Sequence, residues 1–291
     1  MDYGVILPHF SAFAQEDAAT RILTAGTAAE DLGYGTLWAA DHVVFPSKIE
    51  GGYAFNPEDP FLDPLTVLAA LAYKTTKVKL GTAVLILPYR HPLAAAKALA
   101  TIDVLSGGRL VVGVGAGWLA EEFTALGMSI GERGARTNEA MDIFHEVWTK
   151  EEPQYDGQYF RFSDIKFIPK PVQKPRPPIL VGGMTKGALR RTARRGDGWI
   201  AMGKKPDDIK DSLNLLRDFA HQEGRNPETL RICMLPLGAP DLDTLIQDVP
   251  KYEELGVDHL YLSFRAWTEN FSTLMELMER FAREVIKIKE E

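Results

Sequence analysis

Short, nearly continuous apolar runs alternate along the chain with longer segments of helical composition and spacing. Strands that are apolar on both faces are typical of parallel sheets covered by helices. The apolar runs predict strands at residues 5–7, 36–40, 78–87, 110–114, 179–181, 199–202, 230–235 and 259–264. The other segments predict helices at 16–32, 63–74, 92–105, 132–150, 185–195, 207–223, 242–255 and 270–289. Eight strands, each followed by a helix, predict an α/β fold with one closed (β/α)₈ TIM-type barrel rather than an open doubly wound sheet.

The most regular unit of this pattern lies between residues 78 and 114. An apolar run ends at Pro88, an Ala-rich helical segment follows, and Gly107-Gly108 separates it from the next apolar run. This order of elements indicates a right-handed βαβ crossover. In such folds the chemistry lies just beyond the carboxyl ends of the strands, so the residues that follow each run are the first candidates for a site.

The length of the chain fits one barrel with additions. About 250 residues is typical of a barrel, and the 291 residues here predict one domain over 1–291 with insertions at the carboxyl-end mouth. A loop at 43–61 leaves the second strand end and is placed to cover the mouth. Residues 154–162 predict a hairpin with Asp156-Gly157 at its turn, and a proline-rich segment at 169–178 leads into the fifth strand.

Charge and composition exclude several classes of binding partner. A net charge of −7 argues against a nucleic-acid or anionic-membrane partner. No window approaches 18 uninterrupted apolar residues, so no membrane span is expected. The single cysteine, Cys233, cannot form an internal disulfide, and the first residues show no signal-type core. These features predict a cytoplasmic protein with neither a nucleic-acid nor a membrane partner.

Several polar side chains follow the predicted strands and should share one rim of the barrel. His9, Asp41-His42 and Arg90-His91 follow the first three strands. We expect the three histidines to converge at the mouth, which favours a functional role for at least one of them. They also leave a metal hydrolase open. We expect no metal, because the later strand ends offer Gly, Lys and Arg instead of further His or carboxylate ligands.

The fifth strand ends in Gly182-Gly183-Met184-Thr185, at the start of a helix. Glycines there let backbone N–H groups approach an anion, and Thr185 can cap the helix or donate to a ligand. The same residues would also suit a plain tight turn. Four arginines near the other end of this helix are expected to be solvated and to complement its dipole; they are Arg190, Arg191, Arg194 and Arg195.

Five segments together resemble the luciferase-like monooxygenase superfamily, in order and over nearly the whole chain. They are Asp41-His42, GTAVLILPYRHP at 81–92, GGRLVVGVGAGW at 107–118, the stretch with Arg133-Gly134 and Arg136, and PPILVGG…RRGDGWI at 177–200. The resemblance implies a barrel that binds a flavin or the deazaflavin coenzyme F420 at its mouth. The redox chemistry then belongs to the cofactor, and the protein orients it.

The resemblance also bears on the choice of cofactor. In the FMN-dependent branch an arginine after the fourth strand grips the phosphate, and Ala116 stands at that place here, which favours F420 with FMN as the alternative. Trp118 replaces a glutamate of the F420-dependent sugar-phosphate dehydrogenases and is expected to shape an apolar substrate pocket. The implied cofactor-binding residues are Asp41, Ala83, Val84, Gly115, Ala116, Gly117, Gly182, Gly183 and Thr185.

Similar F420 enzymes have a bulge with a non-proline cis peptide in the third strand, which implies one between Ala83 and Val84, facing a flat cavity. His42 is the expected proton partner of the hydride transfer, because it follows the second strand beside Asp41 and an imidazole exchanges protons near neutral pH. His9 is a second catalytic candidate, for contact with the small-molecule substrate. A flavin-binding protein without turnover stays open. Ala-rich helices at 63–74 and 92–105, through which family members commonly dimerise, predict a C₂ homodimer; helix propensity alone would also explain the alanines.

Overall fold

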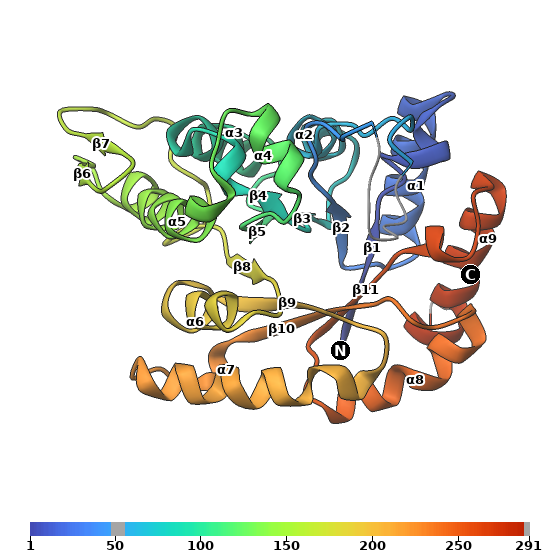
Figure 1. The fold of residues 1–291 in the computed structure, drawn as a ribbon. Coiled ribbons are helices and arrows are strands. Elements are labelled where there is room, and N and C mark those ends of the chain that lie inside the picture. Colours follow the sequence, from blue (N-terminus) through green and yellow to red (C-terminus); the bar gives the residue numbers. More distant parts are fainter. Residues whose placement is uncertain (48–55, 288–291) are drawn as a thin grey trace.

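The computed structural model describes residues 1–47 and 56–287, and it has the predicted architecture (Figure 1). Nine parallel strand segments form one sheet in the order β3-β2-β1-β11-β10-β9-β8-β5-β4, and β3 also pairs with β5. The sheet is therefore closed, with β3 and β4 as two halves of the third of eight barrel strands. The strands are β1 (Asp2–Ile6), β2 (Thr36–Ala39), β3 (Lys79–Thr82), β4 (Leu85–Ile86), β5 (Leu110–Gly115), β8 (Ile179–Gly182), β9 (Gly198–Gly203), β10 (Arg231–Pro236) and β11 (His259–Leu262).

Helices surround the barrel (Figure 1). They are α1 (Ala18–Asp31), α2 (Pro64–Lys74), α3 (Pro92–Leu105), α4 (Ala120–Ala125), α5 (Arg133–Thr149), α6 (Lys186–Arg195), α7 (Lys210–Gln222), α8 (Leu242–Glu254) and α9 (Phe271–Phe281). All but α4 were predicted. Short 3₁₀ turns are η1 (Ser11–Ala14), η2 (Leu87–Tyr89), η3 (Ile130–Glu132), η4 (Pro206–Ile209), η5 (Pro227–Thr229) and η6 (Phe264–Ala266), and a π turn, η7 (Ala282–Ile286), follows α9. In the described residues no helix is long and apolar enough to cross a membrane.

Two insertions differ in detail from the prediction. The hairpin is present as β6 (Tyr155–Asp156) and β7 (Arg161–Phe162), but Asp156 lies in its strand and the connection runs over 157–160, so Asp156-Gly157 is not a two-residue turn. The Glu139 carboxylate accepts hydrogen bonds from backbone amides of this connection and fixes its shape. Of the loop at 43–61, residues 48–55 lie outside the described part, so its role as a cover stays a prediction.

The interior of the barrel is filled by one side chain or more from every strand. These residues pack on one another and form a cluster separate from the layer under the helices; they are Ile6, Trp38, Ala83, Val84, Val111, Leu180, Ile200, Cys233, Leu235 and Tyr261. Trp38 occupies the amino-terminal end, where its indole N–H donates to Nε2 of His259 at 2.9 Å. A Cβ on Gly81 would lie 2.4 Å from the Trp38 ring, so this glycine is needed for the indole to fit.

The third barrel strand is interrupted at the predicted place. The Ala83–Val84 peptide is cis, between the end of β3 and the start of β4, as the resemblance implied. The Val84 side chain lies across the ends of two neighbouring strands, because a Cβ on Gly115 or on Gly182 would come within 2.5 and 2.8 Å of its methyl groups. Ala83 and Val84 thus form the floor of the mouth, and the two glycines make room for it.

One expectation about the outer layer is wrong. Arg191 on α6 is only 8% exposed, not solvated. Its guanidinium donates to the Asn138 side chain at 2.7 Å and to the Gly134 carbonyl at 3.0 Å, and so it joins α6 to α5. Burial and the nearby Arg195 lower the pKa of Arg191 to about 10. A buried arginine held by neutral acceptors keeps a net positive charge inside this part of the wall.

Candidate functional site

Asp41, directly after the second barrel strand, holds the mouth together. Its buried carboxylate forms a two-pronged ion pair with Arg90 at 2.6 and 2.8 Å and accepts a hydrogen bond from the Ile86 amide at 2.8 Å. Arg90 also reaches Asp63, which caps α2, at 3.2 Å. Burial opposes the charge of Arg90, but the two carboxylates outweigh it and raise its pKa. The ends of β2 and β4 are therefore fixed relative to one another.

His42 is paired with a carboxylate that the sequence did not reveal. Its Nδ1 lies 2.8 Å from Oε2 of Glu122, and the Tyr89 hydroxyl donates to the same oxygen at 2.8 Å. The other oxygen accepts from the amides of Val43, at 2.6 Å, and Val44, at 3.2 Å. Every partner is a donor, so the geometry fits an ionised Glu122 and a His42 ring that carries a proton on Nδ1.

The pKa of Glu122 agrees with this arrangement. The side chain is fully buried, and burial alone would raise the pKa of a carboxyl group. Hydrogen bonds from His42, the Val43 amide and Tyr89 outweigh that effect, and the pKa of Glu122 lies below its usual range. The contact has the opposite effect on Tyr89, because burial and the negative charge of Glu122 both raise the pKa of its hydroxyl group.

Aromatic rings surround the His42 imidazole. The ring centroids of Phe45, Phe61 and Trp118 lie 4.6, 5.4 and 5.9 Å from it. Trp118 is 39% exposed and Val43 47%, so apolar surface at this rim reaches solvent beside a half-buried imidazole. An apolar rim with one oriented proton carrier suits a small organic substrate more than a highly charged one.

The other two histidines take different places. His9 is fully buried, with Nδ1 3.0 Å from the Leu7 carbonyl and Nε2 3.0 Å from the Ala40 carbonyl, and burial lowers its pKa. Phe61 packs against both His9 and His42, each at 5.4 Å between ring centroids, so these two are close. A direct contact of His9 with substrate stays a prediction, which this buried position does not support.

His91 does not join them, and the expected convergence of three histidines is wrong. Its Nδ1 accepts from the Leu93 amide at 3.3 Å and caps α3, while its ring packs against Phe160 of the hairpin. Among the residues that the structure describes, no group of three or more His, Cys, Asp or Glu is arranged to hold a metal ion.

The glycine-rich strand ends have steric duties of their own. Besides Gly115 and Gly182, which face Val84, Gly117 has φ +80° and a Cβ there would lie 2.9 Å from Ile86 and Phe123. Thr185 caps α6 by accepting from the Ala188 amide at 3.2 Å. Gly183, with φ +118°, lies between the end of β8 and the start of α6, and a helix N-terminus is a place where an anion is favoured.

Glu122 was missed because α4 was not predicted. A helix of six residues has too little periodicity to assign faces, and Glu121-Glu122 looks like a solvated pair. The available signal was position, since Glu122 lies in the segment that follows the end of β5 at Gly115 and so comes soon after a barrel strand end.

The family model for luciferase-like monooxygenases matches residues 1–238. An F420-dependent glucose-6-phosphate dehydrogenase of Microbacterium testaceum is 32% identical over 246 residues, which are 82% of this chain and 70% of that protein. An FMNH2-dependent dimethylsulfone monooxygenase of Pseudomonas putida is 34% identical over 165 residues, 56% of this chain and 45% of that protein. The solved structure of the monooxygenase RslO1 from Streptomyces bottropensis superposes with a TM-score of 0.80 at 26% identity, over 98% of this chain and 99% of the other.

Glu122→Gln tests the buried carboxylate. The carboxylate offers two acceptor oxygens to its four donors, whereas a glutamine replaces one of these oxygens with an N–H₂ group that cannot accept. We therefore expect the variant to lose about 1–3 kcal/mol of unfolding free energy at neutral pH. Because the folded-state pKa of Glu122 is lowered from 4.5, its stabilisation is present above that pH and is lost as the pH falls further. In acid, the unfolding free energy of the variant should therefore differ less from that of the wild type. Urea unfolding of both proteins at neutral pH and in acid measures the two differences.

Glu121→Gln is the matched control, because Glu121 is exposed and adjacent. Equal unfolding midpoints for the two variants at neutral pH would show that the Glu122 network does not stabilise the mouth.

Proposed function

The chain belongs to the luciferase-like monooxygenase family, and on that premise we propose that it is an oxidoreductase using coenzyme F420 for hydride transfer to or from a small organic substrate. The observation that carries the proposal is the His42–Glu122 pair, with 2.8 Å between the ring nitrogen and the carboxylate, at the end of the second barrel strand. Bound at this mouth, F420 supplies hydride exchange at its ring and reacts poorly with oxygen.

The residues at the mouth fit a flat ring with a phosphate-bearing tail. Ala83 and Val84 offer a small apolar floor held in place by the Asp41 bond to the Ile86 amide. We assign the tail to the segment Gly115 to Gly117 and to Gly182, Gly183 and Thr185, where glycines and a helix N-terminus suit a phosphate. Asp41 acts on the cofactor through this framework, because both of its oxygens already have protein partners.

His42 is assigned the proton that accompanies the hydride. Glu122 holds the ring with its proton on Nδ1, and we assign the exchange of a proton with the substrate to Nε2. Glu122 acts on the reaction through His42 and is a positioning residue. The apolar rim with Trp118 and Val43 excludes water from one side of the imidazole and binds the substrate.

An FMN-dependent monooxygenase is the second candidate. The similarity to the dimethylsulfone monooxygenase favours it. Ala116 argues against an FMN-dependent enzyme, because members of the FMN-dependent branch of the family carry a phosphate-binding arginine at this position. The two candidates differ in oxygen chemistry and therefore in what the mouth must exclude.

Fluorescence titration of the purified protein with F420 and with FMN tests the proposal. We expect saturable binding of F420 at one site per chain. FMN should bind at least roughly tenfold more weakly, because without an arginine at position 116 its phosphate lacks about one charge-assisted contact. Tight FMN binding without F420 binding would establish the second candidate instead. Binding of neither would contradict both.

His42→Ala separates the proton role from binding. We expect F420 affinity to stay within several-fold and turnover with a substrate found by screening alcohols and ketones to fall by roughly 10²-fold or more. His91→Ala, which removes an exposed capping histidine, should keep wild-type turnover within a few-fold. Wild-type turnover in His42→Ala would contradict the assignment of the proton to His42. If the wild-type protein binds the cofactor but shows no turnover, a flavin-binding protein is favoured instead.

We also propose a C₂ homodimer through α2 and α3. Tyr73 on α2 is 88% exposed, and Leu105 at the end of α3 is 58% exposed. The exposed alanines Ala70 and Ala94 allow a close approach of helices there. Light scattering at micromolar concentration should give a dimer for the wild type and a monomer for Tyr73→Glu. Leu237→Glu, which changes an exposed leucine in the segment after β10, should stay dimeric; a monomeric wild type would contradict the proposal.

A further inference from the structure

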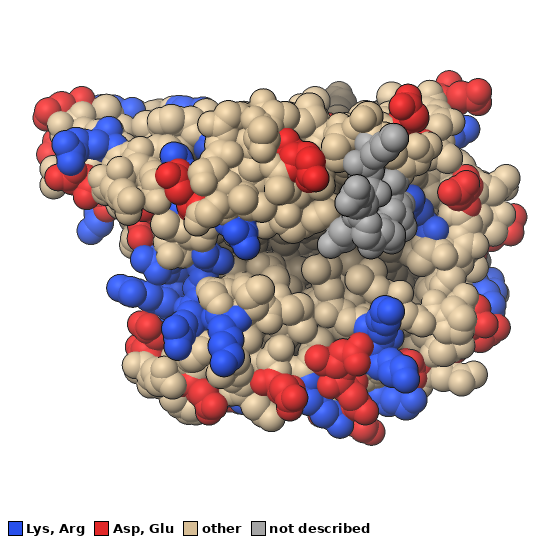
Figure 2. Space-filling model, viewed as in Figure 1, with Lys and Arg blue, Asp and Glu red and all other residues tan. Residues whose placement is uncertain are grey.

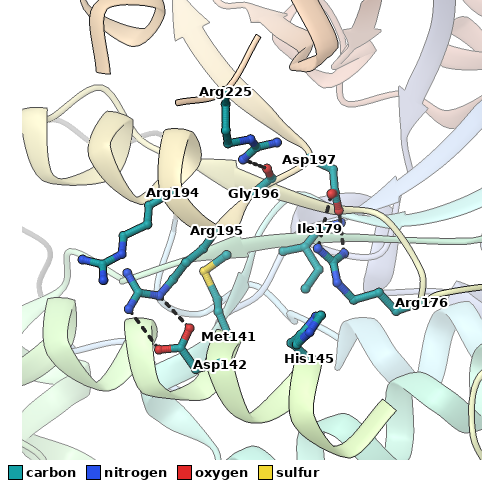
Figure 3. Close-up of a pocket in the computed structure, with 10 residues that line it drawn as sticks. All are labelled: Met141, Asp142, His145, Arg176, Ile179, Arg194, Arg195, Gly196, Asp197 and Arg225. Carbon is teal, nitrogen blue, oxygen red and sulfur yellow. Dashed lines mark hydrogen bonds and ion pairs between the residues drawn. The ribbon is translucent and has the colours of Figure 1, made fainter. Parts of the chain in front are cut away.

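A cavity of about 310 Å³ lies at the end of the barrel opposite the mouth (Figure 3). Its wall includes Ile179, the first residue of β8, and Gly196-Asp197, directly before β9. The mouth, by contrast, begins where β8 ends at Gly182. The cavity therefore opens between α5 and the carboxyl-terminal end of α6, and Lys and Arg side chains gather on this face (Figure 2).

Four arginines from three separate parts of the chain line the cavity. Arg176 comes from the lead into β8, Arg194 and Arg195 from the last turn of α6, and Arg225 from the segment after α7. Convergence of four guanidinium groups is costly unless anions accompany them. Two carboxylates are present, one on α5 and one before β9, so the lining keeps a formal surplus of two positive charges.

The two carboxylates hold two of the arginines in defined orientations. Asp142 accepts from Nε and Nη2 of Arg195 at 2.8 and 2.9 Å. Asp197 accepts from Nη1 and Nη2 of Arg176 at 2.5 and 3.2 Å and from the Ile179 amide at 2.7 Å. Paired forks of this kind are fixed before any ligand arrives, which lowers the ordering cost of binding.

The other two arginines carry the surplus charge. Arg225 donates from Nη1 to the carbonyls of Ala193 and Gly196, both at 2.8 Å, and so fixes the end of α6. Arg194 is exposed beside it. In the described part of the chain, no carboxylate forms an ion pair with either of them. Figure 3 shows both among the residues that line the cavity.

We propose that this cavity binds a small anion of the phosphate type with two or more negative charges, such as a phosphate ester or pyrophosphate. A planar guanidinium group can donate two parallel hydrogen bonds to two oxygens of one phosphate group. An anion with two or more negative charges balances the surplus charge of the lining. The volume is at the lower end of the range for small-molecule pockets. The site is distinct from the mouth and independent of the proposed function.

Binding there also stabilises the wall next to the mouth. Helix α6 begins after Gly183 at the mouth and ends at Arg194 and Arg195 at the cavity, and Arg191 in its middle joins α5. An anion held by these arginines would tie α6 to α5 and to the lead into β8. A ligand that binds only the folded chain raises the unfolding temperature in proportion to the logarithm of its concentration.

Calorimetric titration of the full chain with inorganic pyrophosphate tests the site. We expect one saturable site per chain and a raised unfolding temperature. Arg194→Gln should weaken binding by about tenfold, as expected for a lost charge-assisted contact. Arg190→Gln is the matched control, because Arg190 lies one turn earlier on α6 and stacks on the Phe219 ring outside the cavity; it should stay within about twofold.

Three results would overturn the proposal. One is the absence of saturable binding at millimolar pyrophosphate. Another is an equal loss in Arg194→Gln and Arg190→Gln, which indicates diffuse attraction to a basic surface. The third is loss of pyrophosphate binding when F420 or FMN saturates the mouth, which places the anion at Gly182-Gly183 instead.

Discussion

A carboxylate buried away from water must be matched by donors, and the mouth of this barrel is organised around two of them. Asp41 takes its donors from Arg90 and the Ile86 amide, and Glu122 takes its donors from His42, Tyr89 and the amides that follow His42. The two carboxylates and their donors lie in, or directly after, the second, third and fourth barrel strands. Removing either carboxylate would therefore break a contact between segments that follow neighbouring strands.

A steric constraint complements the electrostatic one. Val84 lies in the interrupted third strand and projects over the ends of β5 and β8, where any side chain larger than hydrogen at positions 115 or 182 would collide with it. The glycines of the mouth therefore serve the floor first. That floor is small and apolar, and it leaves the edges of the neighbouring strands for a ligand. The imidazole of His42 is held at the same mouth by its pairing with Glu122.

The architecture was accessible from the sequence because it depends on local patterns. Eight apolar runs separated by helical segments define the barrel, and the glycines at 115 and 182 mark the strand ends. The partners at the mouth depend on distant contacts. Asp41 and Arg90 are 49 residues apart, and no local pattern reveals that they meet. A strand-end position also says nothing about side-chain direction, which is why His91 was expected at the mouth although it caps α3.

Hydrogen–deuterium exchange with and without F420 tests most directly whether this mouth is where the cofactor binds. We expect slower exchange on F420 addition in peptides that cover 83–86, 114–118 and 182–188, with little change in peptides that cover 194–198 and 225. These three segments contain the floor of the mouth, the end of β5 and the start of α6. Saturating F420 that leaves all three mouth segments unchanged, or protects only the opposite end of the barrel, would contradict it.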